Sequence, residues 1–99
     1  MKETDEYTKV IFRYWMNGVI AIFPEIPGDL SPQNCLSYQH IGQHSACDPS
    51  YIIKSSKPAT ETQYNNLKVE LESLGYKLKV VDKRSPKSIE LRRKELANT

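Results

Sequence analysis

The alternation of apolar and polar positions predicts a β-hairpin near the N-terminal end of the chain. Residues 8–15 alternate and are rich in β-branched and aromatic residues, which is typical of a strand. Asn17-Gly18 follows and favours a tight hairpin turn, because both residues tolerate a positive φ. Residues 19–23 are apolar throughout, which indicates a central strand covered on both faces, and Pro24 is expected to end it.

The middle of the chain predicts a loop followed by a third strand. Residues 24–33 contain three prolines and a glycine, a composition typical of loops. Residues 35–41 can form the third strand, and Gly42 interrupts it. Residues 48–50 predict a turn, which makes the short apolar segment 51–53 a candidate edge strand.

Helical spacing begins after this segment. Thr60 can cap a helix, and Gln63 can complete a capping box with it. The apolar stripe of this helix is predicted to contain Tyr64, Leu67, Leu71 and Leu74. Gly75 should end the helix, because glycine takes the left-handed conformation at a C-terminus without strain. Residues 76–81 then predict the last strand, and Ser85-Pro86 should open a short basic helix that ends near Ala97.

The order of these elements, β-β-β-(β)-α-β and a terminal helix, predicts an α+β fold. A single amphipathic helix can cover only one face of a small antiparallel sheet. We expect a disordered stub over residues 1–7, one α+β domain over 8–82 and a basic C-terminal helix or tail over 83–99. The other face of the sheet would then stay open, and a homodimer would cover it.

Composition agrees with one small domain. The chain has 99 residues, of which 38% are hydrophobic and 26% charged. No apolar run reaches the roughly 18 residues of a membrane span. The acidic N-terminus lacks the order of a signal peptide, so we expect a cytoplasmic protein with no membrane partner and with reduced cysteines.

The charge is unevenly distributed along the chain. Residues 1–75 carry 6 Lys/Arg against 9 Asp/Glu, whereas residues 76–99 carry 8 against 3, and together they give the net +2. A basic end can bind an anionic partner such as nucleic acid, although a solvated helix has the same composition. The candidate nucleic-acid residues are Lys77, Lys79, Lys83, Arg84, Lys87, Arg92, Arg93 and Lys94.

Residues 35–48 contain both cysteines and both histidines of the chain. Thiolate and imidazole groups are ligands that zinc prefers, so Cys35, His40, His44 and Cys47 are a candidate zinc site. Their spacing matches no common zinc motif, and a strand would point Cys35 and His40 to opposite faces. The simpler interpretation makes the cysteines buried core residues, and no metal or other cofactor is expected.

The same stretch can be interpreted as catalytic or as a recognition surface. His40 or His44 could act as a general base for Cys47 or Ser37, but no nucleophile elbow, phosphate loop or paired-carboxylate motif accompanies them in the sequence. Aromatic and amide groups around Gly42 favour recognition instead. The predicted contact surface consists of Tyr38, Gln39, His40, Gln43 and His44, with Arg13 and Trp15 from a neighbouring strand.

Most of residues 10–82 resembles a group of small uncharacterised proteins that bacteriophages and mobile elements encode. The resemblance lies in residues 10–13, residues 18–25 and the string Ser-Tyr-Gln-His-Ile-Gly-Gln-His at 37–44, and it extends through 58–60 and 75–81. It implies a bacterial host cytoplasm and an accessory role. The resulting prediction is a non-enzymatic protein that binds a host or viral macromolecule, for instance to inhibit a host defence system. Nucleic-acid binding through the basic end is the alternative.

Overall fold

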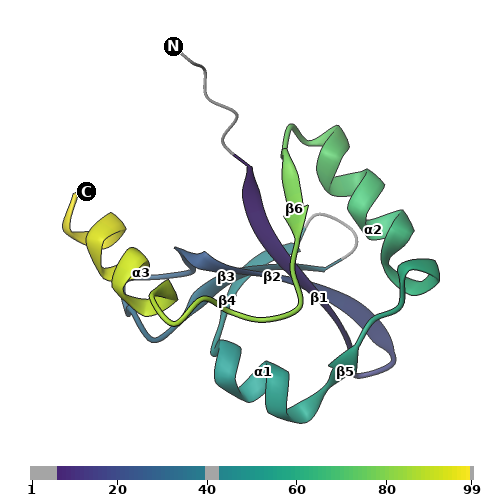
Figure 1. The fold of residues 1–99 in the computed structure, drawn as a ribbon, viewed down its shortest axis with the longest axis horizontal. Helices are drawn as coiled ribbons and strands as arrows, with labels where there is room; N and C mark the ends of the chain where they lie inside the picture. The colour runs from purple at the N-terminus through teal and green to yellow at the C-terminus, as the bar shows by residue number, and fades with distance from the viewer. Residues whose placement is uncertain (1–6, 40–42, 99) are drawn as a thin grey trace.

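The computed structural model describes residues 7–39 and 43–98. Its first four strands form an antiparallel meander (Figure 1). They are β1 (Thr8–Trp15), β2 (Gly18–Pro27), β3 (Cys35–Gln39) and β4 (Gln43–Cys47). The chain continues through α1 (Pro49–Ser55), β5 (Lys57–Pro58), α2 (Glu61–Ser73), β6 (Leu78–Val80) and α3 (Ser88–Ala97).

The sheet has the strand order β4-β3-β2-β1-β5, and β6 also pairs with β1. β5 runs antiparallel to β1 at Arg13 and Tyr14, whereas β6 runs parallel to β1 at residues 8–10. The outer edge of β1 is therefore used by two separate segments of the chain. The predicted α+β class, with a mainly antiparallel sheet and a C-terminal helix, is confirmed.

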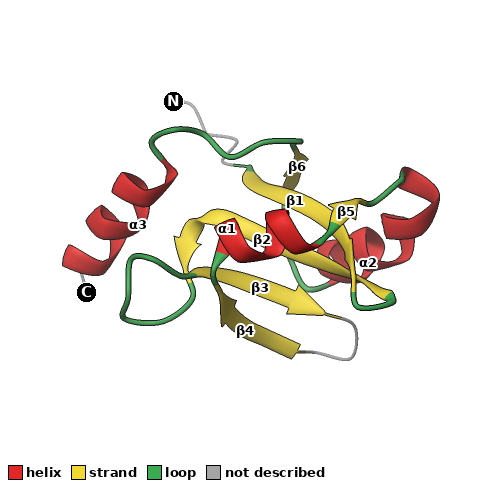
Figure 2. Cartoon of the chain, turned by 90° about the horizontal axis from the view of Figure 1, so that it is seen from below, coloured by secondary structure: helices red, strands yellow, loops and turns green. Residues whose placement is uncertain are grey.

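Apolar side chains pack on both faces of the sheet. On one face Leu67 and Leu71 of α2 pack against Phe12, Phe23 and Tyr38. α1 lies over the other face (Figures 1 and 2). There its Ile52 packs in a cluster with residues of β1, β2 and β3. β2 lies between β3 and β1 and is covered on both faces, as its continuous apolar run predicts.

The prediction that one face of the sheet lies open is wrong. Residues 51–53 are part of α1 rather than a strand, because the Asp48 side chain caps the helix by accepting from Ser50 N and Pro49 occupies its first turn. α1 places Ile52 over the second face. Ile11 and Ile20 on that face are each only 2% exposed and Trp15 is half-buried, so α1 covers the apolar surface from which the homodimer was inferred.

Two strand boundaries also differ from the predictions. β2 continues through Pro24 to Pro27, and its pairing with β3 shifts register between Phe23 and Pro27. A proline is compatible with such an irregular stretch because no regular ladder bond is required there. The hairpin turn is Met16-Asn17, with φ of 52° and 65°, one residue earlier than expected.

The capping signals predicted for α2 are confirmed, whereas α3 begins at Ser88 with Lys87 as its N-cap residue, and not at the predicted Ser85-Pro86. Thr60 and Gln63 form the capping box of α2, and Gly75 has a φ of 106° after the helix. Leu74 departs from the predicted stripe because it is the C-cap residue and is largely exposed. α3 packs against β2 and lies at the opposite end of the sheet from α2 (Figure 2).

Candidate functional site

The β3–β4 hairpin sorts the predicted site residues onto two faces. Cys35 lies opposite Cys47, and Ser37 lies opposite Ser45. Successive residues of a strand point to opposite faces, so His44, which precedes Ser45, projects from the other side. His44 and the two cysteines therefore cannot share one metal ion. The zinc hypothesis is not supported, and its remaining ligand, His40, lies outside the described residues.

His44 belongs to an aromatic group on the α2 face of the sheet. Its ring packs edge-on against Tyr38 with centroids 4.6 Å apart, and its Nε2 lies 2.9 Å from the Tyr76 hydroxyl. Tyr76 in turn stacks on Phe23, with centroids 5.1 Å apart. The imidazole is exposed, yet these contacts fix its position. Burial of the Tyr76 ring raises the pKa of its hydroxyl, so it stays protonated near neutral pH.

Tyr38 is the buried member of this aromatic group. Its ring is buried in the core, and its hydroxyl donates a hydrogen bond to the Glu70 carboxylate on α2. Tyr38 is thus a structural residue rather than part of an exposed contact surface. Gln39 is half-buried, and only the backbone of Gln43 is described, paired with Gln39.

Arg13 and Trp15 do not join His44. Both project from the α1 face, where Trp15 is half-buried against the second core cluster. The Arg13 guanidinium is buried and donates to the Ser56 hydroxyl at 2.8 Å and to the carbonyls of Ile53 and Ser56 at 3.0 and 2.8 Å. Arg13 therefore fastens the C-terminal end of α1 to β1.

The two cysteines form a close pair on the α1 face. Their sulfur atoms are 3.7 Å apart, and both are free thiols. Cys35 is fully buried, whereas Cys47 is half-buried. His44 projects away from Cys47, so these two residues do not form the base and nucleophile of a catalytic site.

The basic residues divide into exposed side chains and one buried side chain. Arg92 is only 3% exposed, and its Nε and a terminal nitrogen donate to the carbonyls of Pro32 at 2.8 Å and Pro24 at 2.5 Å. It anchors α3 and is not available to a phosphate. The exposed members of the predicted nucleic-acid set are Lys77, Lys79, Lys83, Arg84, Lys87, Arg93 and Lys94. Of these, Lys87, Arg93 and Lys94 line a hollow of about 490 Å³ on the outer side of α3.

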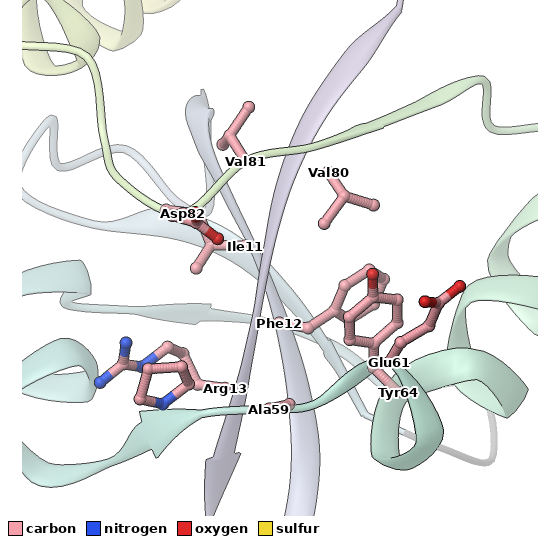
Figure 3. A pocket seen from close by; sticks show the side chains of 10 residues that line it. Ile11, Phe12, Arg13, Ala59, Glu61, Tyr64, Val80, Val81 and Asp82 are labelled. Atoms are coloured by element: carbon pink, nitrogen blue, oxygen red, sulfur yellow. The ribbon is translucent and has the colours of Figure 1, made fainter.

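The sequence did not reveal a groove of about 420 Å³ along the outer edge of β1 (Figure 3). The groove lies where the hydrogen-bonding partner of β1 changes from the β6 segment to residues 58–59. Val10 O accepts from Val81 N, and Phe12 O accepts from Ala59 N. Its lining comes from four separate segments of the chain, so no local motif could reveal it. Two of the lining residues, Glu61 and Asp82, are exposed carboxylates.

Comparison of the chain with protein-family models, with curated proteins and with solved structures found no match. Within residues 7–39 and 43–98, no three or more His, Cys, Asp and Glu side chains are grouped so as to hold a metal ion. No helix in this described part is long and apolar enough to cross a membrane.

Proposed function

We propose that the protein is a non-enzymatic binding protein, an accessory protein of the bacteriophage type that contacts a host or viral macromolecule in the host cytoplasm. Inhibition of a host defence system is a purpose consistent with the resemblance of residues 10–82 to phage proteins. The observation that carries the proposal is the exposed His44 ring, held in place by Tyr38 and Tyr76.

A fixed and exposed side chain suits binding, because its conformational entropy has been lost before the partner arrives. We call His44 and Tyr76 the His44 surface. Leu74 lies two residues before Tyr76 in the sequence and is 56% exposed. The Tyr76 phenol, and not a carboxylate, contacts the imidazole, and the nearby Glu70 carboxylate accepts from Tyr38. This arrangement favours recognition over general base catalysis.

Replacing His44 by alanine is expected to weaken partner binding at least tenfold, which corresponds to about 1.4 kcal/mol. The partner would be identified by crosslinking through a photoreactive group at position 74, followed by mass spectrometry. Affinity for the purified partner would then be measured for wild type and His44→Ala. The matched control is Tyr51→Ala, which removes another exposed aromatic ring, from α1.

Equal affinities of wild type and His44→Ala, with both proteins folded by circular dichroism, would contradict the assignment of this surface. Tyr76→Phe provides a finer test. It keeps the ring that stacks on Phe23 but removes the hydroxyl that holds His44, so a loss of about fivefold is expected from one hydrogen bond.

Nucleic-acid binding is the second candidate function, and the outer side of α3 favours it. Lys87, Arg93 and Lys94 are exposed together there, while Arg92 faces inward and fixes the helix. Removing the whole segment after Val81 would also remove this anchor, so neutralising the exposed charges is the cleaner experiment.

The combined variant Lys87→Gln, Arg93→Gln and Lys94→Gln is expected to reduce the salt dependence of DNA binding. If all three residues contact phosphates, the slope of log K against log salt should fall by about 0.9 per contact. Fluorescence anisotropy with a labelled duplex measures this slope. Lys77→Gln with Lys79→Gln, near β6, is the control. An unchanged slope in the α3 variant would exclude this surface.

A further inference from the structure

The register of the β3–β4 hairpin brings Cys35 and Cys47 into direct opposition. Opposed residues in an antiparallel pair have Cα atoms about 4.5–5.5 Å apart. Disulfides span Cα separations of about 4.4–6.8 Å, so the backbone already has the spacing that a bond requires. The two sulfur atoms are 3.7 Å apart, and side-chain rotation alone can shorten this distance.

We propose that Cys35 and Cys47 form a redox-active dithiol, which an oxidant of the hydroperoxide class converts into an intramolecular disulfide. The proposal is independent of the His44 surface, because the thiols lie on the other face of the sheet. It concerns a modification of the fold itself and requires no macromolecular partner.

The surroundings of the pair give the two thiols different roles. Cys47 is half-buried and can meet a small oxidant, whereas Cys35 is fully buried. Hydrogen bonds from the Cys35 thiol and the Ser37 hydroxyl, together with the positive charge of Arg92, lower the pKa of Cys47 despite burial and the nearby Asp48. The same hydrogen bond, and burial, raise the pKa of Cys35. Cys47 is therefore the attacking thiolate, and Cys35 is the resolving thiol.

The chemistry balances in two steps. The Cys47 thiolate attacks the terminal oxygen of the hydroperoxide, so that an S–O bond forms as the O–O bond breaks and the sulfur is oxidised to a sulfenic acid. The departing alkoxide or hydroxide takes up the proton that Cys47 lost on ionisation and leaves as an alcohol or water. The Cys35 sulfur then attacks the sulfenic sulfur. The S–S bond forms as the S–O bond breaks, and the hydroxyl leaves as water with the Cys35 proton. Two electrons pass from the thiols to the peroxide in total.

Closure of the bond would tie the edge strand β4 to β3 at the point where α1 begins. Cys47 is the last residue of β4, and the next residue, Asp48, caps α1. The disulfide would thus join the base of α1 covalently to the sheet.

Intact mass spectrometry of the full chain after treatment with hydrogen peroxide tests the proposal. The expected product is a monomer lighter by two hydrogen atoms, about 2 Da, and dithiothreitol should restore the original mass. The chain has only two cysteines, so one cross-linked peptide containing both identifies the bond. Retention of both thiols, independent oxidation of each, or linkage only between molecules would overturn the proposal.

Two variants separate the roles of the thiols. Cys35→Ser should leave a sulfenic acid on Cys47 that dimedone traps, whereas Cys47→Ser should leave Cys35 unreacted under the same conditions. Dimedone labelling of Cys35 in the second variant would contradict the assigned roles.

A measurement on the wild-type protein avoids any folding defect of these variants. Phenylarsine oxide bridges two neighbouring thiols, so one equivalent added to the folded protein should protect both from a thiol-reactive dye that is applied after unfolding in urea. Protection of neither thiol, or of only one, would contradict the pair.

Discussion

Replacing Arg92 by alanine is expected to lower the free energy of unfolding by about 2–4 kcal/mol, because it leaves two carbonyl groups without their charged donor. Those groups are Pro24 O in β2 and Pro32 O in the following loop, which lie 68 and 60 residues from Arg92 in the sequence. The guanidinium therefore ties the end of the chain to its first third. Burial lowers the pKa of Arg92, but the pKa of an arginine side chain remains far above neutral pH, so the guanidinium stays charged.

Arg93→Ala is the matched control, since it removes the same side chain from the next, exposed position of α3. The free energy of unfolding of Arg93→Ala is expected to differ from that of wild type by no more than about 0.5 kcal/mol. Urea unfolding monitored by circular dichroism measures both variants. Arg92→Lys should recover only part of the loss, because an ammonium group cannot reproduce the planar donor geometry of a guanidinium. Equal stability of the Arg92 and Arg93 variants would show that α3 is not anchored by these bonds.

The inward position of Arg92 also explains why the role of the terminal helix could not be predicted. The buried residues of α3 are Ser88 and Arg92, both polar. A helix that packs on a sheet normally shows an apolar stripe, and without one the sequence indicates only a solvated tail. The hydrogen bonds of Arg92 to distant carbonyls help to attach α3, and such partners leave no periodic pattern in the sequence.

The β3–β4 hairpin did leave a signal in the sequence. Cys-x-Ser-x-Gln at residues 35–39 is mirrored by Gln-x-Ser-x-Cys at residues 43–47, and each residue of the first half lies opposite its counterpart in the second. Residues at equal distances before and after a hairpin turn lie opposite each other in the antiparallel pair, where their side chains contact. This symmetry favours both the hairpin and the opposed cysteines. The zinc hypothesis instead required His44 and Cys47 to lie close together in space, and the hairpin places them on opposite faces.

The segment at residues 48–55 shows how a capping signal outweighs a short apolar run. Tyr51-Ile52-Ile53 has strand propensity, yet Asp48 followed by Pro49 is a helix start, and the structure follows the cap. By contrast, Thr60, Gln63 and Gly75 were sufficient to place α2, because both ends of that helix carry their own signals. Local chemistry thus predicted the boundaries of α2, while contacts between distant segments determined the groove and the anchoring of α3.

Gly28→Ala is expected to lower the free energy of unfolding by about 1–3 kcal/mol or more, as overpacking between rigid backbones does. A Cβ at this position would lie 2.3 Å from Cys35 O and 2.7 Å from Ala46 Cα, so the added methyl would meet the backbone of both β3 and β4. No flexible side chain can move aside to relieve such contacts. The loop after β2 must therefore move away from the hairpin that carries the two cysteines.

Gly18→Ala is the matched control, because a Cβ there would meet no atom within 4 Å. Its effect should be close to zero, or slightly stabilising through the smaller entropy of the unfolded chain. Urea midpoints and slopes of the two variants, compared with wild type, separate close packing from a general cost of replacing glycine. If Gly28→Ala were as stable as Gly18→Ala, the loop would have to pack less tightly against the hairpin than these distances require.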